Sequence, residues 1–223
     1  MQKALFPIAA ASAFAVVAAV SLAGSATASS AGSAPGLVHG TSTHSTPTSA
    51  AQPAKGACYS ENIDDSLTGI VSINTDDGSG WTSSGAVDFQ VKKKCKITQV
   101  DATGVYAAGS GPADSFDVNF YKSKKGLPGK LVKTQNISGD FSSPVLSLTI
   151  KPVKLKKGDY FVSVVGNMNF SDVGGWFWEL STGQYGKYDS AFQNTGGAFG
   201  FCPTWEGVAD CYGYSGDYMV ALS

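Results

Sequence analysis

Short runs of alternating apolar and polar residues recur through the second half of the chain. In residues 115–120, Phe116, Val118 and Phe120 fall on one side of an extended backbone, and residues 145–150 repeat the pattern. Further strands are predicted over residues 97–107, 160–165, 174–180 and 217–222. A period of two residues is typical of a strand with one buried face. No segment shows a convincing 3.6-residue period, so no amphipathic helix is predicted.

Glycine-rich turns separate these strands, at residues 109–112, 125–129 and 195–197. Such clusters favour chain reversals because Gly reaches positive φ and Pro fixes φ. Many short strands between turns predict an all-β domain. The expected architecture is an antiparallel two-sheet sandwich, jelly-roll-like, stapled by two disulfides.

The N-terminal segment has the features of a secretory signal. A short basic start is followed by an apolar stretch over residues 4–23 and by the small-residue site Ala26-Thr27-Ala28. This pattern predicts a signal peptide over residues 1–28, in preference to an uncleaved anchor. Residues 29–55 are rich in Ala, Ser, Thr and Pro and predict a disordered linker. Residues 56–223 are then the β-sandwich domain of a secreted, extracellular protein with no stable membrane insertion after cleavage.

Charge gives little support for binding to nucleic acid. The chain carries 17 acidic and 16 basic residues, and every basic residue is Lys. Arg, the usual bidentate reader of phosphate and guanine, is absent. Lysines cluster at residues 92–96 and 151–157. We expect solvated turns and strand edges there, and weak attraction to anionic wall polymers is the alternative.

Four cysteines lie in the predicted domain, and four cysteines permit three disulfide pairings. The short segment between Cys202 and Cys211, with Pro203 and Gly207 inside it, favours that pair. Cys58 and Cys95 would then form the second. A Cys₄ zinc site is less favoured because its usual closely spaced cysteine pairs are missing.

Few residues are available for catalysis. Both histidines, His39 and His44, lie in the predicted linker, where they could bind a metal only weakly. Without histidine, triads and most general-base schemes are excluded from the domain. A glycosidase-like carboxylate pair, Glu179 beside Trp178 and Glu206 beside Trp205, is the remaining route. We expect both acids to be solvated and predict no catalytic residues and no enzyme activity.

An acidic turn, residues 76–80, could supply oxygen ligands to calcium, with Asp64 and Asp65 adding more. It lacks the later bidentate Glu of an EF-hand loop. We favour a solvated turn, and predict no metal and no cofactor.

Aromatic residues are the strongest candidates for binding. Trp176 and Trp178 are two residues apart and share one face of a strand. We favour a core position for this pair, which would leave Phe177 and Glu179 outside; an exposed sugar-stacking pair is the alternative. The predicted ligand-binding residues are the aromatics of the following Gly-rich stretch: Tyr185, Tyr188, Trp205 and Tyr212.

Several motifs together carry a family resemblance: GVY at residues 104–106, GPADS at 111–115, GLPG at 126–129, WEL at 178–180 and C-x-x-W at 202–205. With them, about residues 76–222 resemble an uncharacterised β-rich domain family of secreted bacterial surface proteins. The resemblance implies export and a β-sandwich, and implies no catalytic residues. We therefore expect a secreted non-catalytic binding or surface module, with extracellular polysaccharide or another cell-surface polymer as partner. A structural matrix protein is the alternative, ahead of a glycosidase.

Overall fold

The computed structural model describes residues 35–39, 58–60 and 68–223. The predicted signal peptide, His44, Asp64 and Asp65 lie outside these ranges, as does the predicted linker apart from residues 35–39. The described residues all belong to one compact unit. No helix of the described residues is long and apolar enough to cross a membrane.

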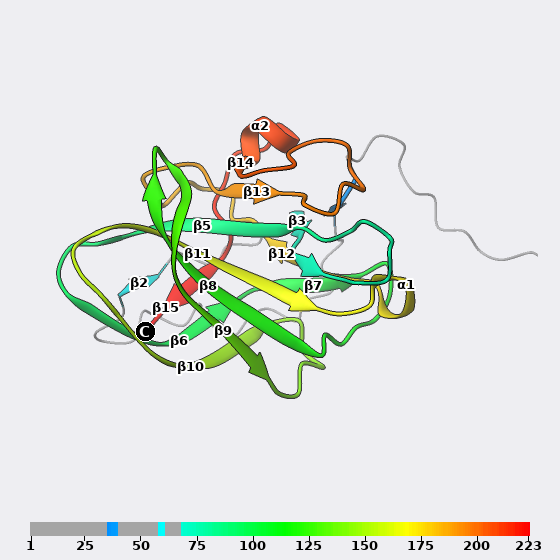
Figure 1. The fold of residues 1–223 in the computed structure, drawn as a ribbon, viewed down its shortest axis with the longest axis horizontal. Helices are drawn as coiled ribbons and strands as arrows, with labels where there is room; N and C mark the ends of the chain where they lie inside the picture. Colours follow the sequence, from blue (N-terminus) through cyan, green and yellow to red (C-terminus); the bar gives the residue numbers. More distant parts are fainter. Residues whose placement is uncertain (1–34, 40–57, 61–67) are drawn as a thin grey trace, which may run out of the picture. The chain divides into compact units, whose positions relative to one another are not determined.

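The described residues form three sheets, in which nearly all pairs are antiparallel (Figure 1). The first has the order β1 (Leu37–His39), β3 (Thr68–Val71), β12 (Gly175–Glu179), β7 (Gly104–Ala107). The second has the order β10 (Leu146–Leu155), β6 (Cys95–Ala102), β15 (Val220–Leu222), β2 (Tyr59–Ser60). The third has the order β14 (Glu206–Gly207), β13 (Ala191–Gln193), β5 (Ser84–Val91), β11 (Gly158–Asn167), β8 (Ser115–Lys124), β9 (Leu127–Ser138), and β4 (Ile73–Asn74) pairs in parallel with β11.

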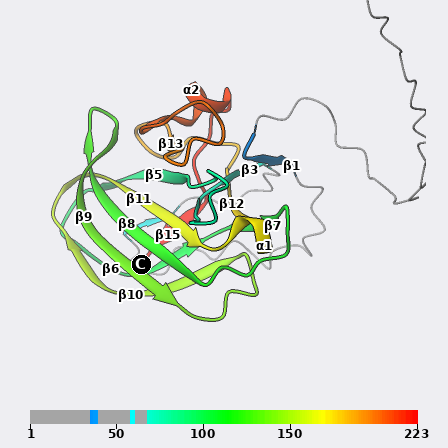
Figure 2. The ribbon, with the colours of Figure 1, turned by 45° about the vertical axis from the view of Figure 1, so that its right-hand side comes forward.

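The two smaller sheets join at Thr103. This residue separates β6 from β7, its N–H donates to the carbonyl of Met219, and its own carbonyl accepts from the N–H of Glu179. Both sheets contribute to one hydrophobic core with the seven-stranded sheet. The predicted all-β, antiparallel sandwich is confirmed. Two short helices, α1 (Phe170–Val173) and α2 (Val208–Tyr212), complete the domain, and α2 lies beside β13 (Figures 1 and 2).

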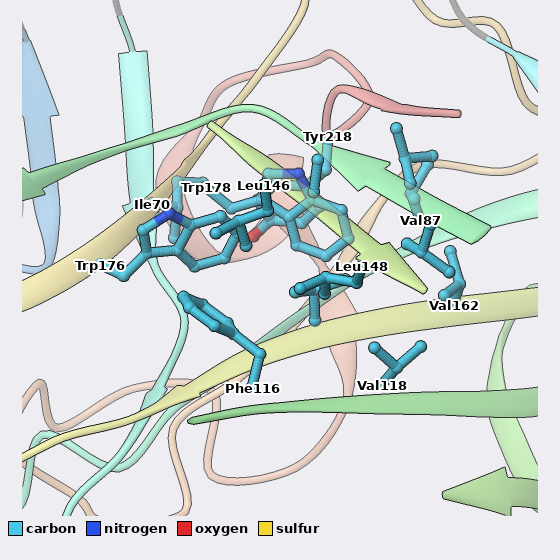
Figure 3. Packing of buried hydrophobic residues seen from close by; sticks show 14 of the residues in the cluster. Ile70, Val87, Phe116, Val118, Leu146, Leu148, Val162, Trp176, Trp178 and Tyr218 are labelled. Carbon is cyan, nitrogen blue, oxygen red and sulfur yellow. The ribbon is translucent and has the colours of Figure 1, made fainter. Parts of the chain in front are cut away.

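The alternating strands bury the predicted faces. Phe116, Val118 and Phe120 of β8 are fully buried, and the apolar side of β10 lies in the same core. Figure 3 shows Phe116 and Val118 packed toward residues of the other layer, Leu146, Leu148 and Trp176 among them. The rings of Phe116 and Trp176 meet edge to face with centroids 5.2 Å apart, so the two layers are held together by direct aromatic packing.

Trp176 and Trp178 are both fully buried core residues. Their indole N–H groups donate to the carbonyls of Pro144 and Met219, each at 2.9 Å. Buried indoles need such partners, and the pair is closed to any sugar. Gly104 faces Trp176, where an added Cβ would lie 2.5 Å from the indole, so only glycine fits there.

Two sequence predictions about burial are wrong. Phe177 and Glu179 are buried, with 2% and 6% of their surface exposed, because β12 is a central strand flanked by β3 and β7. A run of four consecutive apolar residues, 175–178, was the signal for burial on both faces. The linker prediction also fails for residues 37–39, because Leu37 and Val38 supply apolar side chains that pack with the core while β1 pairs with β3.

The disulfides are Cys58–Cys95 and Cys202–Cys211, as predicted. The first joins the residue before β2 to the start of β6. The second joins Cys202, between β13 and β14, to Cys211 in α2. All four thiols are consumed, which leaves none for the alternative zinc site.

Candidate functional site

The four predicted ligand-binding aromatics do not form one surface. Tyr212 is only 8% exposed, and its ring packs edge to face on Phe192 and Phe201. Burial raises the pKa of its hydroxyl well above the ordinary value. This corrects the prediction for Tyr212, because the ring fills the core beneath α2 and is closed to a ligand.

Trp205 and Tyr188 are half-buried on the outer face of the seven-stranded sheet. They cover a small apolar cluster centred on the buried Phe161. Trp205 meets the ring of Tyr121 edge to face at 5.9 Å. Their rings are therefore partly occupied by packing against the protein itself.

Of the four predicted ligand-binding aromatics, Tyr185 lines a cavity. The ring is 41% exposed and lines a cavity of about 650 Å³, within the size range of ligand sites. Three segments form the walls: residues 58–59, residues 90–95 and residues 185–187. The lining residues are Cys58, Tyr59, Gln90, Val91, Lys92, Lys93, Lys94, Cys95, Tyr185, Gly186 and Lys187.

A smaller hollow of about 300 Å³ shares part of its lining with this cavity. The two share Gln90, Val91 and Lys92, and the smaller one adds Lys157, Gly158 and Asp159. Lys187 donates to Asp159 at 2.8 Å, so an ion pair links the rims of the two. This hydrogen bond lowers the pKa of Asp159 and raises that of Lys187.

The sheet and a disulfide fix one side of the cavity. Lys92, Lys93 and Lys94 form the turn between β5 and β6. The Cys58–Cys95 bond ties the end of this turn to the strand that carries Tyr59. The ring of Tyr59 rests near that of the buried Phe89, with centroids 6.0 Å apart. A disulfide across such a turn restricts how far the lysines and Tyr59 can move apart.

Two buried carboxylates fix the other side. Asp217 accepts hydrogen bonds from the backbone N–H groups of Tyr185 and Gly186. Asp88 accepts from the N–H groups of Lys187 and Tyr188, at 2.9 and 3.3 Å. Four consecutive N–H groups are thus held from beneath, which sets the positions of the Tyr185 and Lys187 side chains.

The packing under this loop is tight. A Cβ placed on Gly186 would lie 1.9 Å from Oδ1 of Asp88. Asp88 is 1% exposed, and burial raises the pKa of its carboxyl to about 6, against the opposing effect of the N–H donors. Burial also raises the pKa of Asp217. The loop therefore lies over acids that are costly to ionise.

The two alternative sites, the carboxylate pair and the acidic turn, do not contribute to this cavity. Glu179 lies in β12 and Glu206 in β14, in different sheets, and neither lines the cavity. Asp77 accepts hydrogen bonds from Ser79 and from the N–H and hydroxyl of Ser171, which lower its pKa far below the ordinary value. Its oxygens thus bind protein donors. Among the described residues no group of three or more His, Cys, Asp or Glu could hold a metal ion.

Comparison with protein-family models, curated proteins and solved structures finds no match to this chain. The resemblance to secreted bacterial β-rich domains stays a prediction. The site accordingly has to be judged on its own chemistry. Sequence reasoning identified Tyr185 but missed Tyr59, Gln90 and Lys187 as its neighbours. The lysine run at residues 92–94 was the available signal, and it was interpreted as a solvated turn.

Proposed function

We propose that this domain is an extracellular, non-catalytic binding module that takes polysaccharide in the cavity lined by Tyr59 and Tyr185. The observation that carries the proposal is this cavity of about 650 Å³, which combines two tyrosine rings with Gln90 and lysine ammonium groups. Tyrosine presents a flat apolar face to a sugar ring and loses little conformational entropy on binding. Amide and ammonium groups can bond to sugar hydroxyls.

The chemistry of the lining favours binding over catalysis. The lining residues of the larger cavity include no histidine, no carboxylate and no free thiol. General acid–base catalysis relies most often on histidine and on carboxylates. An extracellular location is in keeping with two disulfides, because disulfides persist in oxidising compartments.

The test is an array of glycans and cell-wall fractions probed with the secreted protein and with Tyr185→Ala. Tyr214→Ala is the matched control, because Tyr214 is similarly exposed, at 39%, and does not line the cavity. We expect binding by the wild type and by Tyr214→Ala, with a loss of about tenfold for Tyr185→Ala, the usual cost of removing one aromatic contact. Trp205→Ala should bind like the wild type.

Absence of binding to every fraction by a folded protein would contradict the proposal and favour a structural matrix role. Equal binding by Tyr185→Ala, together with loss in Trp205→Ala, would move the site to the outer face of the seven-stranded sheet.

A further inference from the structure

We infer that the polysaccharide held in this cavity is a polyanion, a chain bearing carboxylate or phosphate groups that Lys92, Lys93 and Lys94 bind by charge. The inference rests on the proposed function and deepens it. It is based on the excess of lysine over acidic residues in the cavity lining, although the chain as a whole is nearly neutral.

Positive charge is concentrated at the cavity. The whole chain has a formal net charge of −1, yet the eleven lining residues include four lysines and no acid. Lys92, Lys93 and Lys94 are exposed, and none pairs with an acid of the described residues. The three neighbouring ammonium groups repel one another. The Cys58–Cys95 disulfide holds the turn that carries them. The three ammonium groups are therefore available to a ligand.

The carboxylates near the cavity already accept hydrogen bonds from groups of the protein. Asp88 and Asp217 are buried beneath the loop and accept its backbone N–H groups. Asp159, at the smaller hollow, accepts from Lys187 and from the amide of Gln90. An anionic chain would thus meet lysines first, while the partly exposed carboxylate of Asp159 is already paired.

The two hollows favour a chain over a small anion. They share Gln90, Val91 and Lys92, and the smaller one adds Lys157 beyond the ion pair. Lysines therefore border both hollows. A polymer with regularly spaced charges can contact lysines of both hollows at once, whereas a small anion bound in one hollow contacts only the lysines of that hollow.

The absence of arginine predicts weak discrimination among anions. Lysine acts as a point charge on a flexible stem, whereas arginine matches the planar geometry of a carboxylate or phosphate with two parallel hydrogen bonds. We therefore expect carboxylated and phosphorylated glycans to bind within about tenfold of each other.

The experiment measures affinity of the secreted protein for four probes of matched length: oligogalacturonate, a poly(glycerol phosphate) glycan, neutral dextran and a single-stranded oligonucleotide. It compares Lys92→Gln/Lys93→Gln/Lys94→Gln with a control of equal charge change, Lys124→Gln/Lys130→Gln/Lys133→Gln. The control lysines lie on the β8–β9 hairpin and do not line either hollow. Thermal unfolding of both variants checks that each is folded.

We expect an acidic glycan to bind at least about tenfold more tightly than dextran, and to lose at least about tenfold between about 0.01 M and about 1 M NaCl. The cavity triple variant should lose about tenfold and the control variant little, in line with the modest strength of exposed ion pairs.

The two proposals fail in different ways. If dextran binds as well as the acidic glycans, without salt dependence, and Tyr185→Ala still loses binding, the polyanion inference is overturned and the binding function stands. If the oligonucleotide binds as tightly as the acidic glycans, the inference of a polysaccharide ligand is overturned. If no probe and no array fraction binds, the proposed function fails with it.

Discussion

Replacing Asp88 by Asn should remove a pH dependence of stability that arises beneath the cavity loop. Asp88 is almost fully buried, and its Oδ1 has no hydrogen-bond partner. Burial raises its pKa from 3.8 to about 6, and the nearby charge of Asp217 adds to the effect. In Asp88→Asn the amide oxygen can still accept from Lys187 and Tyr188, so the loop keeps its anchor while the titration is lost.

The sign and size follow from linkage. Well below pH 3.8 the carboxyl is protonated in both folded and unfolded chains, and its favourable contribution is complete. Between about pH 4 and 6 the unfolded chain releases the proton first, so the free energy of unfolding falls as pH rises. A shift from 3.8 to about 6, at 1.36 kcal/mol per pKa unit, gives a loss of about 3 kcal/mol by pH 7.

Urea unfolding at pH 4, 5, 6 and 7, followed by tryptophan fluorescence, measures this directly. The free energy of unfolding of Asp88→Asn minus that of the wild type should rise by about 2.5 kcal/mol between pH 4 and 7. Asp217 remains in both proteins, so the difference reports the titration of Asp88 together with its electrostatic coupling to Asp217. A difference constant to within about 1 kcal/mol would refute the reasoning, because the two N–H donors would then compensate for burial.

Three further changes test the packing. Gly186→Ala should displace the loop, because its Cβ would meet Asp88 at 1.9 Å; glycan titration should show weaker binding, and an unchanged affinity would contradict the close fit. Removing the Cys58–Cys95 bond, which spans 37 residues, should cost about 4 kcal/mol against about 3 for the other disulfide, which spans nine, and denaturant unfolding of the two double-Ala variants should give that order. Trp176→Ala should cost about 3–5 kcal/mol in the same assay, and a loss below about 1 kcal/mol would place the indole outside the core.

Much of the fold could be predicted because its signals are local. The alternation in β8 and β10 requires one buried face, and the short segment between Cys202 and Cys211 favours closure of that disulfide. Burial on both faces of β12 was missed because a period-two pattern was assumed where four apolar residues run together. Strand β1 was missed because three residues in a polar stretch carry almost no pattern.

The site was predicted only in part because it is built from distant segments. Tyr59 reaches the cavity through the pairing of β2 with β15 at the end of the chain, Tyr59 opposite Leu222. No local pattern predicts that pairing. Tyr185 and Tyr212 looked alike in a Gly-rich stretch, yet one is exposed and the other lies in the core. Tyr212 is the last residue of α2 and faces the core, and this helix was not predicted from the sequence.

The most direct test of the binding site is a nitrogen-15 NMR titration of the secreted protein with the tightest-binding glycan of the array. We expect amide shift changes that are largest in residues 58–59, 90–95 and 185–187, the three walls of the cavity. Shift changes centred on Trp205 and Tyr121, or spread evenly over the sheets, would contradict it.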